Sequence, residues 1–406
     1  MEIECKKRGL VLGGGGARGI YEIGAWIALQ SCGIHFDVVV GTSIGALVGA
    51  MYVQNHLKEV LDFVYHLSPE QIVTDMMDPL DNFEEVLANK EALFAFFKSY
   101  LKDGMDVTPL RTEIEKMFDY DAFMASDIDF GCMTYSVDRH KGVPFFKEDF
   151  SSENAVDILM ASASCYPAFP VTKIEEETFI DGGYADNLPV SLALERGAEE
   201  LYVVDVHGLG FVHKVDTDVC IHKIEPILSL GHILDFSQRQ GMRSLELGYL
   251  ETMKFLGEYC GYIYTFCADD WPKVYMIEQY LELMFHNFEL DDFESVLEDV
   301  LGFCPVCLDN RFSKSYRFGH LVEALAYVCD MDLVRLYNYD EFLDGLKKRL
   351  DSIYEKKEGT LYNFYSVLEK NAGKYPLYMD AIRPIRRSSY YLAYVWYFLS
   401  VYLKKG

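Results

Sequence analysis

The sequence predicts an α/β domain with a mostly parallel sheet in its first half and a helical domain in its second half. Up to about residue 210, short apolar runs alternate with helical patterns, which is typical of parallel strands joined by helices. Beyond that point strand-like runs disappear, and long helical patterns rich in Tyr and Phe take over. Because 406 residues suffice for two domains, we predict one over residues 1–210 and an all-helical one of unknown role over residues 211–406.

The predicted strands of the first domain are short and apolar. Two of them, residues 10–12 and 36–40, each run into a glycine-containing loop and then into a helix. These helices are expected at 20–30 and, after Gly45, up to about residue 55. The later elements of the domain are expected in this order: a helical insertion at 57–101, strands at 128–137 and 143–147, a helix at 153–162, a strand ending at 179–180 and a strand at 201–206.

Composition excludes some partners and compartments. The net charge of −27 argues against a nucleic-acid partner, since phosphate binding needs clustered Lys and Arg, and it opposes attraction of the whole molecule to anionic lipid. The ten cysteines are scattered without the spacing of a disulfide framework, and the only C-x-x-C, Cys304 to Cys307, has no second pair at zinc-finger spacing. The N-terminus has acidic residues and no apolar segment before the first glycine run. We therefore expect a cytoplasmic protein without a secretory signal.

A candidate nucleophile follows the second strand. Gly41-Thr42-Ser43-Ile44-Gly45 fits the pattern G-x-S-x-G and stands between a buried strand and a helix. The glycines let the chain turn sharply and expose the Ser43 hydroxyl, and the N-terminus of the helix favours negative charge beside it. A tight turn with a solvated serine is the alternative.

A glycine run follows the first strand. In Gly13-Gly14-Gly15-Gly16-Ala17-Arg18-Gly19, consecutive glycines let backbone N–H groups converge on one anion, as an oxyanion hole requires. The run does not fit a Walker A loop, because no Gly-Lys-Ser/Thr follows. A dinucleotide fingerprint fits Gly14-x-Gly16-x-x-Gly19, but the acidic residue expected at the end of the next strand is missing.

A candidate partner for the serine comes at the end of a later strand. Phe179-Ile180-Asp181-Gly182-Gly183 places a carboxylate before two glycines that permit a tight turn, so that the side chain can point into a cleft. An ordinary Asp-Gly turn is the alternative when this motif is considered alone.

Together the three motifs resemble those of patatin-like phospholipases, which carry G-G-G-x-[KR]-G, G-x-S-x-G and D-G-[GA] in this order. Two further stretches are also similar, residues 161–170 and Asn187-Leu188-Pro189. The resemblance covers about residues 8–207, roughly half of the chain. It implies a three-layer α/β/α domain and a lipid acyl hydrolase that acts on a lipid or another acyl ester without cofactor or metal.

The resemblance also implies roles for individual residues. Ser43 attacks the ester and Asp181 acts as general base and then as acid, forming a Ser–Asp dyad without histidine. The amides of Gly14, Gly15 and Gly16 form the oxyanion hole, and Arg18 adds positive charge nearby unless it is only a surface residue of the first helix turn. Gly41, Gly45, Gly182 and Gly183 support the two catalytic turns.

Two other functions stay open at this stage. The order Ser43, Asp181, His207 also matches the order of an α/β-hydrolase triad, so the chain could be a carboxylesterase in which His207 completes the site. A lipid-binding scaffold that has lost turnover is the non-enzymatic alternative.

Two aromatic segments could contact lipid. The insertion contains aromatic and Met side chains that could cover an acyl chain or simply pack on the core, namely Met76, Met77, Phe94, Phe96, Phe97 and Tyr100. Near the C-terminus, Arg383, Arg386 and Arg387 precede the aromatic run 390–403, and Lys404 and Lys405 follow it. No apolar run reaches the roughly 18 to 20 residues of a spanning helix, so the run predicts either peripheral contact with a membrane surface or a buried helix of the second domain.

Overall fold

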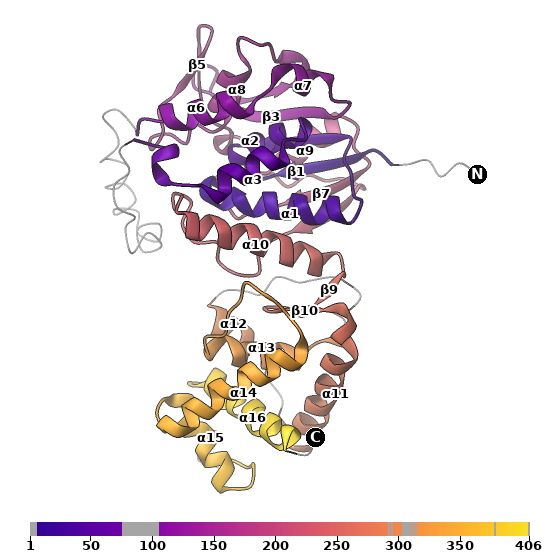
Figure 1. Cartoon of the computed structure of the whole chain (residues 1–406), viewed down its shortest axis with the longest axis vertical. Helices are drawn as coiled ribbons and strands as arrows, with labels where there is room; N and C mark the ends of the chain where they lie inside the picture. The colour runs from indigo at the N-terminus through magenta and orange to yellow at the C-terminus, as the bar shows by residue number, and fades with distance from the viewer. Residues whose placement is uncertain are drawn as a thin grey trace, which may run out of the picture. The chain divides into compact units, whose positions relative to one another are not determined.

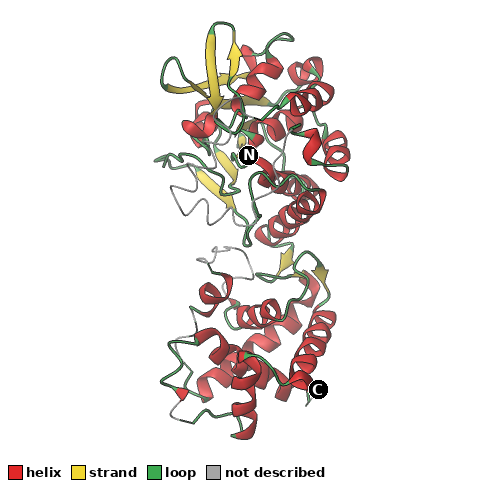
Figure 2. Ribbon diagram, turned by 90° about the vertical axis from the view of Figure 1, so that its left-hand side faces the viewer, coloured by secondary structure: helices red, strands yellow, loops and turns green. Residues whose placement is uncertain are grey.

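The computed structural model describes residues 6–74, 105–290, 293, 295–302, 310, 312, 315–376 and 379–404. The chain divides into two compact units, Met1–Tyr249 and Leu250–Gly406 (Figure 1). Strands gather in the first unit and helices dominate the second (Figure 2).

The first unit is built on an eight-stranded sheet in the order β5-β6-β3-β2-β1-β7-β8, with β4 paired to β3. Its strands are β1 (Arg8–Leu12), β2 (Val38–Thr42), β3 (Asp129–Ser136), β4 (Lys141–Phe146), β5 (Thr172–Ile174), β6 (Glu177–Asp181), β7 (Glu200–Val204) and β8 (Cys220–Ile224). The central strands from β3 to β8 pair in parallel, whereas β4, β5 and β6 are antiparallel additions. The predicted mostly parallel sheet is confirmed.

Helices and short 3-10 turns connect these strands. The helices are α1 (Ile20–Ser31), α2 (Ile44–Val53), α3 (Leu57–Tyr65), α6 (Thr108–Met117), α7 (Tyr120–Ala125), α8 (Ala155–Ser162), α9 (Val190–Glu195) and α10 (Gln238–Phe255). The turns are η1 (Gly16–Gly19), η2 (Pro69–Gln71), η3 (Lys147–Asp149) and η4 (Gly182–Tyr184).

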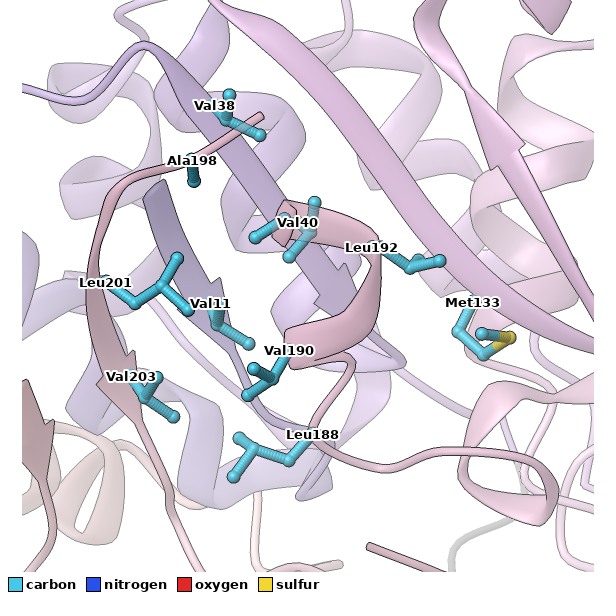
Figure 3. Close-up of a cluster of buried hydrophobic side chains, with 11 residues drawn as sticks. Val11, Val38, Val40, Met133, Leu188, Val190, Leu192, Ala198, Leu201 and Val203 are labelled. Carbon is cyan, nitrogen blue, oxygen red and sulfur yellow. The ribbon is translucent and has the colours of Figure 1, made fainter. Parts of the chain in front are cut away.

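Helices cover both faces of the sheet, because apolar side chains point from its strands to either side. Val11 and Val40 belong to an apolar cluster with Val190 and Leu192 of α9 (Figure 3). Neighbouring residues of the same strands point the other way, because a Cβ on Gly49 of α2 would meet Val39, Phe130 and Leu12. Since successive side chains of a strand alternate between faces, α2 and α9 lie on opposite sides of the sheet. This is the three-layer α/β/α arrangement.

The second unit is mainly helical, but it is not all-helical as predicted. It contains α11 (Trp271–Asn287), α12 (Val296–Leu301), α13 (Gly319–Val328), α14 (Tyr339–Lys356), α15 (Thr360–Lys370) and α16 (Arg387–Leu403), with the turn η5 (Ala268–Asp270). A small sheet of β9 (Tyr259–Cys260), β10 (Thr265–Cys267) and β11 (Leu336–Tyr337) accompanies them. These strands have two or three residues each, too few for any alternation to appear in the sequence.

The division between the units differs from the predicted boundary. We placed it at residue 210, whereas the compact units divide after Tyr249. β8 and most of α10 therefore belong to the first unit. β8 is an edge strand with mostly exposed residues, so it shows no apolar run that could mark it in the sequence.

The aromatic C-terminal run is a buried helix within its unit. α16 packs against α11, α12, α13 and α15. Nine of its residues are buried, among them Tyr391, Trp396 and Phe398. Most aromatic side chains of this run are thus buried inside the unit, as the buried-helix alternative predicts. Among the described residues, no helix combines the length and the apolar character needed to span a bilayer.

Candidate active site

The candidate nucleophile sits on a strained turn between β2 and α2. Ser43 has φ 56° and ψ −125°, a conformation that residues other than glycine rarely adopt. A Cβ on Gly41 would lie 2.3 Å from the carbonyl oxygen of Gly45, so a side chain there would force the turn open. The Ser43 amide donates to the Ser162 hydroxyl at 3.0 Å, and that hydroxyl donates to the Met133 carbonyl at 2.7 Å. These bonds fix the turn to α8 and β3.

The carboxylate of Asp181 meets the Ser43 hydroxyl at the end of β6. The Ser43 side chain is near enough to lower the pKa of the Asp181 carboxyl, and Asp181 accepts the amide N–H of Gly183 at 2.7 Å. Burial raises the pKa of the Asp181 carboxyl to about 6, although the Ser43 side chain and the Gly183 amide lower it. At neutral pH the carboxylate is therefore ionised and more basic than an exposed aspartate.

The glycine loop lies against the same turn, but its amides are not equivalent. The amide of Gly14 donates to the Asn187 carbonyl at 3.0 Å, and the Asn187 side-chain amide donates to the Gly14 carbonyl at 3.1 Å. No hydrogen bond of the Gly15 or Gly16 amides appears in the described part of the chain, and both residues line the cavity that contains Ser43 and Asp181. Of the three amides predicted as oxyanion donors, that of Gly14 is therefore already bonded to the backbone of Asn187.

Arg18 connects loops and does not line the cavity. Its guanidinium donates from Nε to the Gly231 carbonyl and from Nη1 to the His207 carbonyl, each at 2.8 Å. These bonds join η1 to the segments after β7 and β8. The sequence interpretation could not show this, because both acceptors are backbone carbonyls about 190 or more residues away.

A largely apolar cavity of about 340 Å³ opens beside Ser43 and Asp181. Part of its lining comes from elements that the sequence did not connect with the site. Helices α3 and α6 contribute Phe63, Val64, Leu110, Ile114 and Met117. The chain just after α3 contributes Leu67, and the chain after β8 contributes Ile233, Leu234 and Phe236. The periodic apolar residues of α3 and α6 indicate that one face of each helix is buried, but they do not indicate that this face lines a ligand cavity.

His207 does not line the cavity that contains Ser43 and Asp181. Its side chain is half-exposed, with Nδ1 4.0 Å from Asp205 and Nε2 3.8 Å from Glu225. No histidine is among the described residues that line the cavity. Although Asp205, His207 and Glu225 could hold a metal ion by their spacing, Lys223 forms ion pairs with both carboxylates and already supplies a positive charge there.

Some predicted residues lie outside the described part of the chain. They are the insertion residues Met76, Met77, Phe94, Phe96, Phe97 and Tyr100, the pair Cys304 and Cys307, and Lys405.

The comparisons with known proteins concern the same part of the chain. The family model described as patatin-like phospholipase matches residues 10–194. Lysophospholipase NTE1 of Chaetomium globosum is 32% identical over 204 residues, and those of Neurospora crassa and Pyricularia oryzae are 30% and 31% identical over 204 residues. Each match takes in 50% of this chain and 12% of the relative, so the chain spans only a small part of these proteins.

Among solved structures, VipD from Legionella pneumophila aligns with 97% of this chain and 90% of its own, with a TM-score of 0.38 and 13% identity. The matched residues 10–194 contain the strained serine turn, the glycine loop and the aspartate of β6. Residues 10–194 of the chain are therefore a patatin-like phospholipase domain.

Proposed function

We propose that the chain hydrolyses an acyl ester of a lipid through an acyl-enzyme on Ser43, with Asp181 as the catalytic partner. The observation that carries this proposal is that Ser43, on its strained turn, and the buried carboxylate of Asp181 line the same apolar cavity, where the Ser43 side chain acts on the Asp181 carboxyl. A serine becomes a nucleophile when an adjacent base accepts its proton, and a base is effective when its pKa lies near the working pH.

The chemistry then runs in two steps. In the first, Asp181 takes the proton of Ser43 as the oxygen attacks the ester carbonyl, and the same carboxyl protonates the leaving alcohol as its C–O bond breaks. In the second, Asp181 takes a proton from water, which attacks the acyl-enzyme, and Ser43 is restored when the acid leaves. The negative charge that develops on the carbonyl oxygen would be met by the amides of Gly15 and Gly16, with the N-terminus of α2 adding its dipole.

The cavity supports a substrate with an acyl chain. Its walls away from the catalytic groups are aliphatic and aromatic, from α2, α3 and α6, and its volume lies at the lower end for small-ligand sites. The relatives are named lysophospholipases. A lipid with a single acyl chain is therefore the first substrate to test.

The dyad is preferred over a triad because His207 contacts other carboxylates and is not at the cavity. The variant His207→Ala tests this directly, since the dyad predicts that esterase activity stays within about twofold of wild type. A loss of two or more orders of magnitude, of the size expected when a general base is removed, would support the carboxylesterase alternative.

A fluorophosphonate probe tests the proposal as a whole. We expect the wild-type chain to be labelled at Ser43, Ser43→Ala to be unlabelled, and Asp181→Asn to be labelled at least about 100-fold more slowly, as general-base loss predicts. The matched controls Ser191→Ala and Asp216→Asn change exposed residues and should be labelled like wild type. A folded wild-type chain that does not react would instead support the lipid-binding scaffold.

We also propose a cytoplasmic location. Six of the described cysteines form no disulfide, which suits a reducing compartment; they are Cys132, Cys165, Cys220, Cys260, Cys267 and Cys329. Subcellular fractionation with a soluble marker tests this, and recovery in an extracellular fraction would contradict it.

A further inference from the structure

Exposed apolar side chains surround the mouth of the cavity. Tyr166, Tyr184, Leu209 and Phe211 line the cavity and are nevertheless 42 to 65% exposed, with Phe211 the most exposed. Val212, beside Phe211, is 56% exposed. We call these five residues the apolar rim. Single exposed apolar residues are ordinary on a protein surface, but a contiguous group at the entrance to a ligand site indicates a contact surface.

Hydrogen bonds hold the rim in place beside the catalytic aspartate. The Phe211 amide donates to the Gly183 carbonyl at 2.9 Å, and the Asn187 amide donates to the Phe211 carbonyl at 2.6 Å. The Tyr184 hydroxyl donates to the Tyr166 carbonyl. The rim segments are thus fastened to the turn that follows Asp181, and their apolar side chains are presented to solvent on an ordered backbone.

The segments that form the rim are free of acidic residues, although the chain as a whole has a net charge of −27. Residues 161–172, 182–185 and 206–215 contain no Asp or Glu, whereas the chain has 64 of them. A charge left in a contact with hydrocarbon is costly, so the exclusion of carboxylates is what contact with an apolar phase requires.

We propose that the apolar rim docks on the surface of a neutral or zwitterionic lipid aggregate, with the acyl cavity opening into that surface. This inference rests on the proposed function, because it says that the enzyme takes its lipid substrate from the surface of an aggregate. Aromatic side chains with a polar tip, such as Tyr166 and Tyr184, suit the boundary between headgroups and chains. The strong negative charge of the molecule favours a zwitterionic surface over an anionic one.

A tryptophan reporter tests the rim directly. In the full chain carrying Ser43→Ala, so that no lipid is consumed, Phe211→Trp should show a blue shift of its emission on addition of phosphatidylcholine vesicles. The matched control is Ile221→Trp in β8, where an exposed apolar residue lies outside the rim. Its emission should stay unchanged, because that position remains in water.

A binding measurement gives the size of the effect. In co-sedimentation with the same vesicles, Phe211→Ser in the Ser43→Ala chain should weaken binding roughly tenfold or more, because the ring that the docked chain buries in the lipid is lost. Ile221→Ser should bind like its parent. Thermal unfolding confirms that both variants are folded. If Phe211→Ser unfolds the chain, the Phe211→Trp variant still tests docking, because this substitution keeps a large apolar side chain at position 211.

Several outcomes would overturn the proposal. One is an equal shift of tryptophan emission at positions 211 and 221. Others are no binding of the parent to phosphatidylcholine vesicles, or stronger binding to phosphatidylglycerol vesicles. A shift of the emission at 211 that follows protein concentration without lipid would indicate that a second copy of the chain covers the rim. Failure of the proposed function is a separate result, because it appears as missing fluorophosphonate labelling at Ser43, whereas docking is measured without catalysis.

Discussion

Asp181 has to satisfy two opposed demands. Its burial beside an apolar cavity disfavours the charged form and raises its pKa to about 6, while the Ser43 hydroxyl and the Gly183 amide stabilise that form. The balance leaves a carboxylate that is ionised at neutral pH and still basic enough to take a proton from a serine. A fully solvated aspartate would be ionised too, but it would be a much weaker base.

This balance predicts the pH dependence of the reaction. Because the base must be unprotonated, kcat/KM for a soluble ester should be level above pH 7 and should fall about tenfold per pH unit below about pH 6. Rates measured between pH 4.5 and 8, with unfolding followed at each pH, check this. A rate that stays constant down to pH 4.5 would contradict the role given to Asp181.

The same burial predicts a stability gain when the charge is removed. The folded pKa of Asp181 is raised above its unfolded value near 3.8, so the ionised side chain costs stability. That cost is absent below about pH 3.8 and fully present above about pH 6. Asp181→Asn should therefore raise the unfolding free energy by on the order of 2 kcal/mol at pH 8 and by much less at pH 4. Denaturant unfolding at the two pH values measures this, and a variant less stable than wild type at pH 8 would refute it.

At the scale of elements, α1 and α10 approach so closely that their backbones touch. A Cβ on Gly24 of α1 would lie 2.1 Å from the Leu245 carbonyl oxygen, and one on Gly248 of α10 would lie 2.0 Å from the Tyr21 carbonyl oxygen. Since both obstacles are backbone atoms, a side chain at either position requires the helices to move apart. The contact explains why residues 238–249 belong to the first unit in spite of their distance along the chain.

Gly24→Ala tests this contact. We expect a loss of about 2 kcal/mol or more of unfolding free energy, typical of overpacking in a core. The control is Gly345→Ala in α14, where the added Cβ meets only the end of the Met331 side chain at 3.1 Å. That change should be neutral or stabilising, because alanine favours a helix more than glycine does. Equal effects of the two substitutions would show that helix propensity, and not the close approach, decides.

A feature of the fold or the site could be predicted from the sequence when residues close to it along the chain determine it. The turns at Ser43 and Asp181 were recognisable, because local glycine spacing specifies them. The engaged amide of Gly14 was not, since its acceptor on Asn187 is distant in sequence and belongs to the backbone. β8 was missed because an exposed edge strand needs no apolar run, and the aromatic pattern of α16 fits a buried helix as well as an interfacial one.

At the scale of the whole molecule, each unit has its own core. In the first unit, Leu201 and Val203 of β7 join the cluster between the sheet and α9. In the second, the ring of Phe285 packs against those of Tyr391 and Phe398. The proposed chemistry uses residues of the first unit, from Gly15 to Asp181. Stability and activity should therefore respond differently to damage in the two cores.

A pair of matched substitutions tests this separation. Leu201 in β7 and Leu281 in α11 are both fully buried, so that truncation to alanine should cost about 2 to 5 kcal/mol in either unit. We expect Leu201→Ala to lower the urea concentration at which fluorophosphonate labelling of Ser43 is lost. Leu281→Ala should leave that concentration unchanged and shift only the part of the helical circular dichroism that belongs to the second unit. A single transition that both substitutions move equally would mean that the two cores unfold as one cooperative structure, and that the second unit supports the active site through its stability.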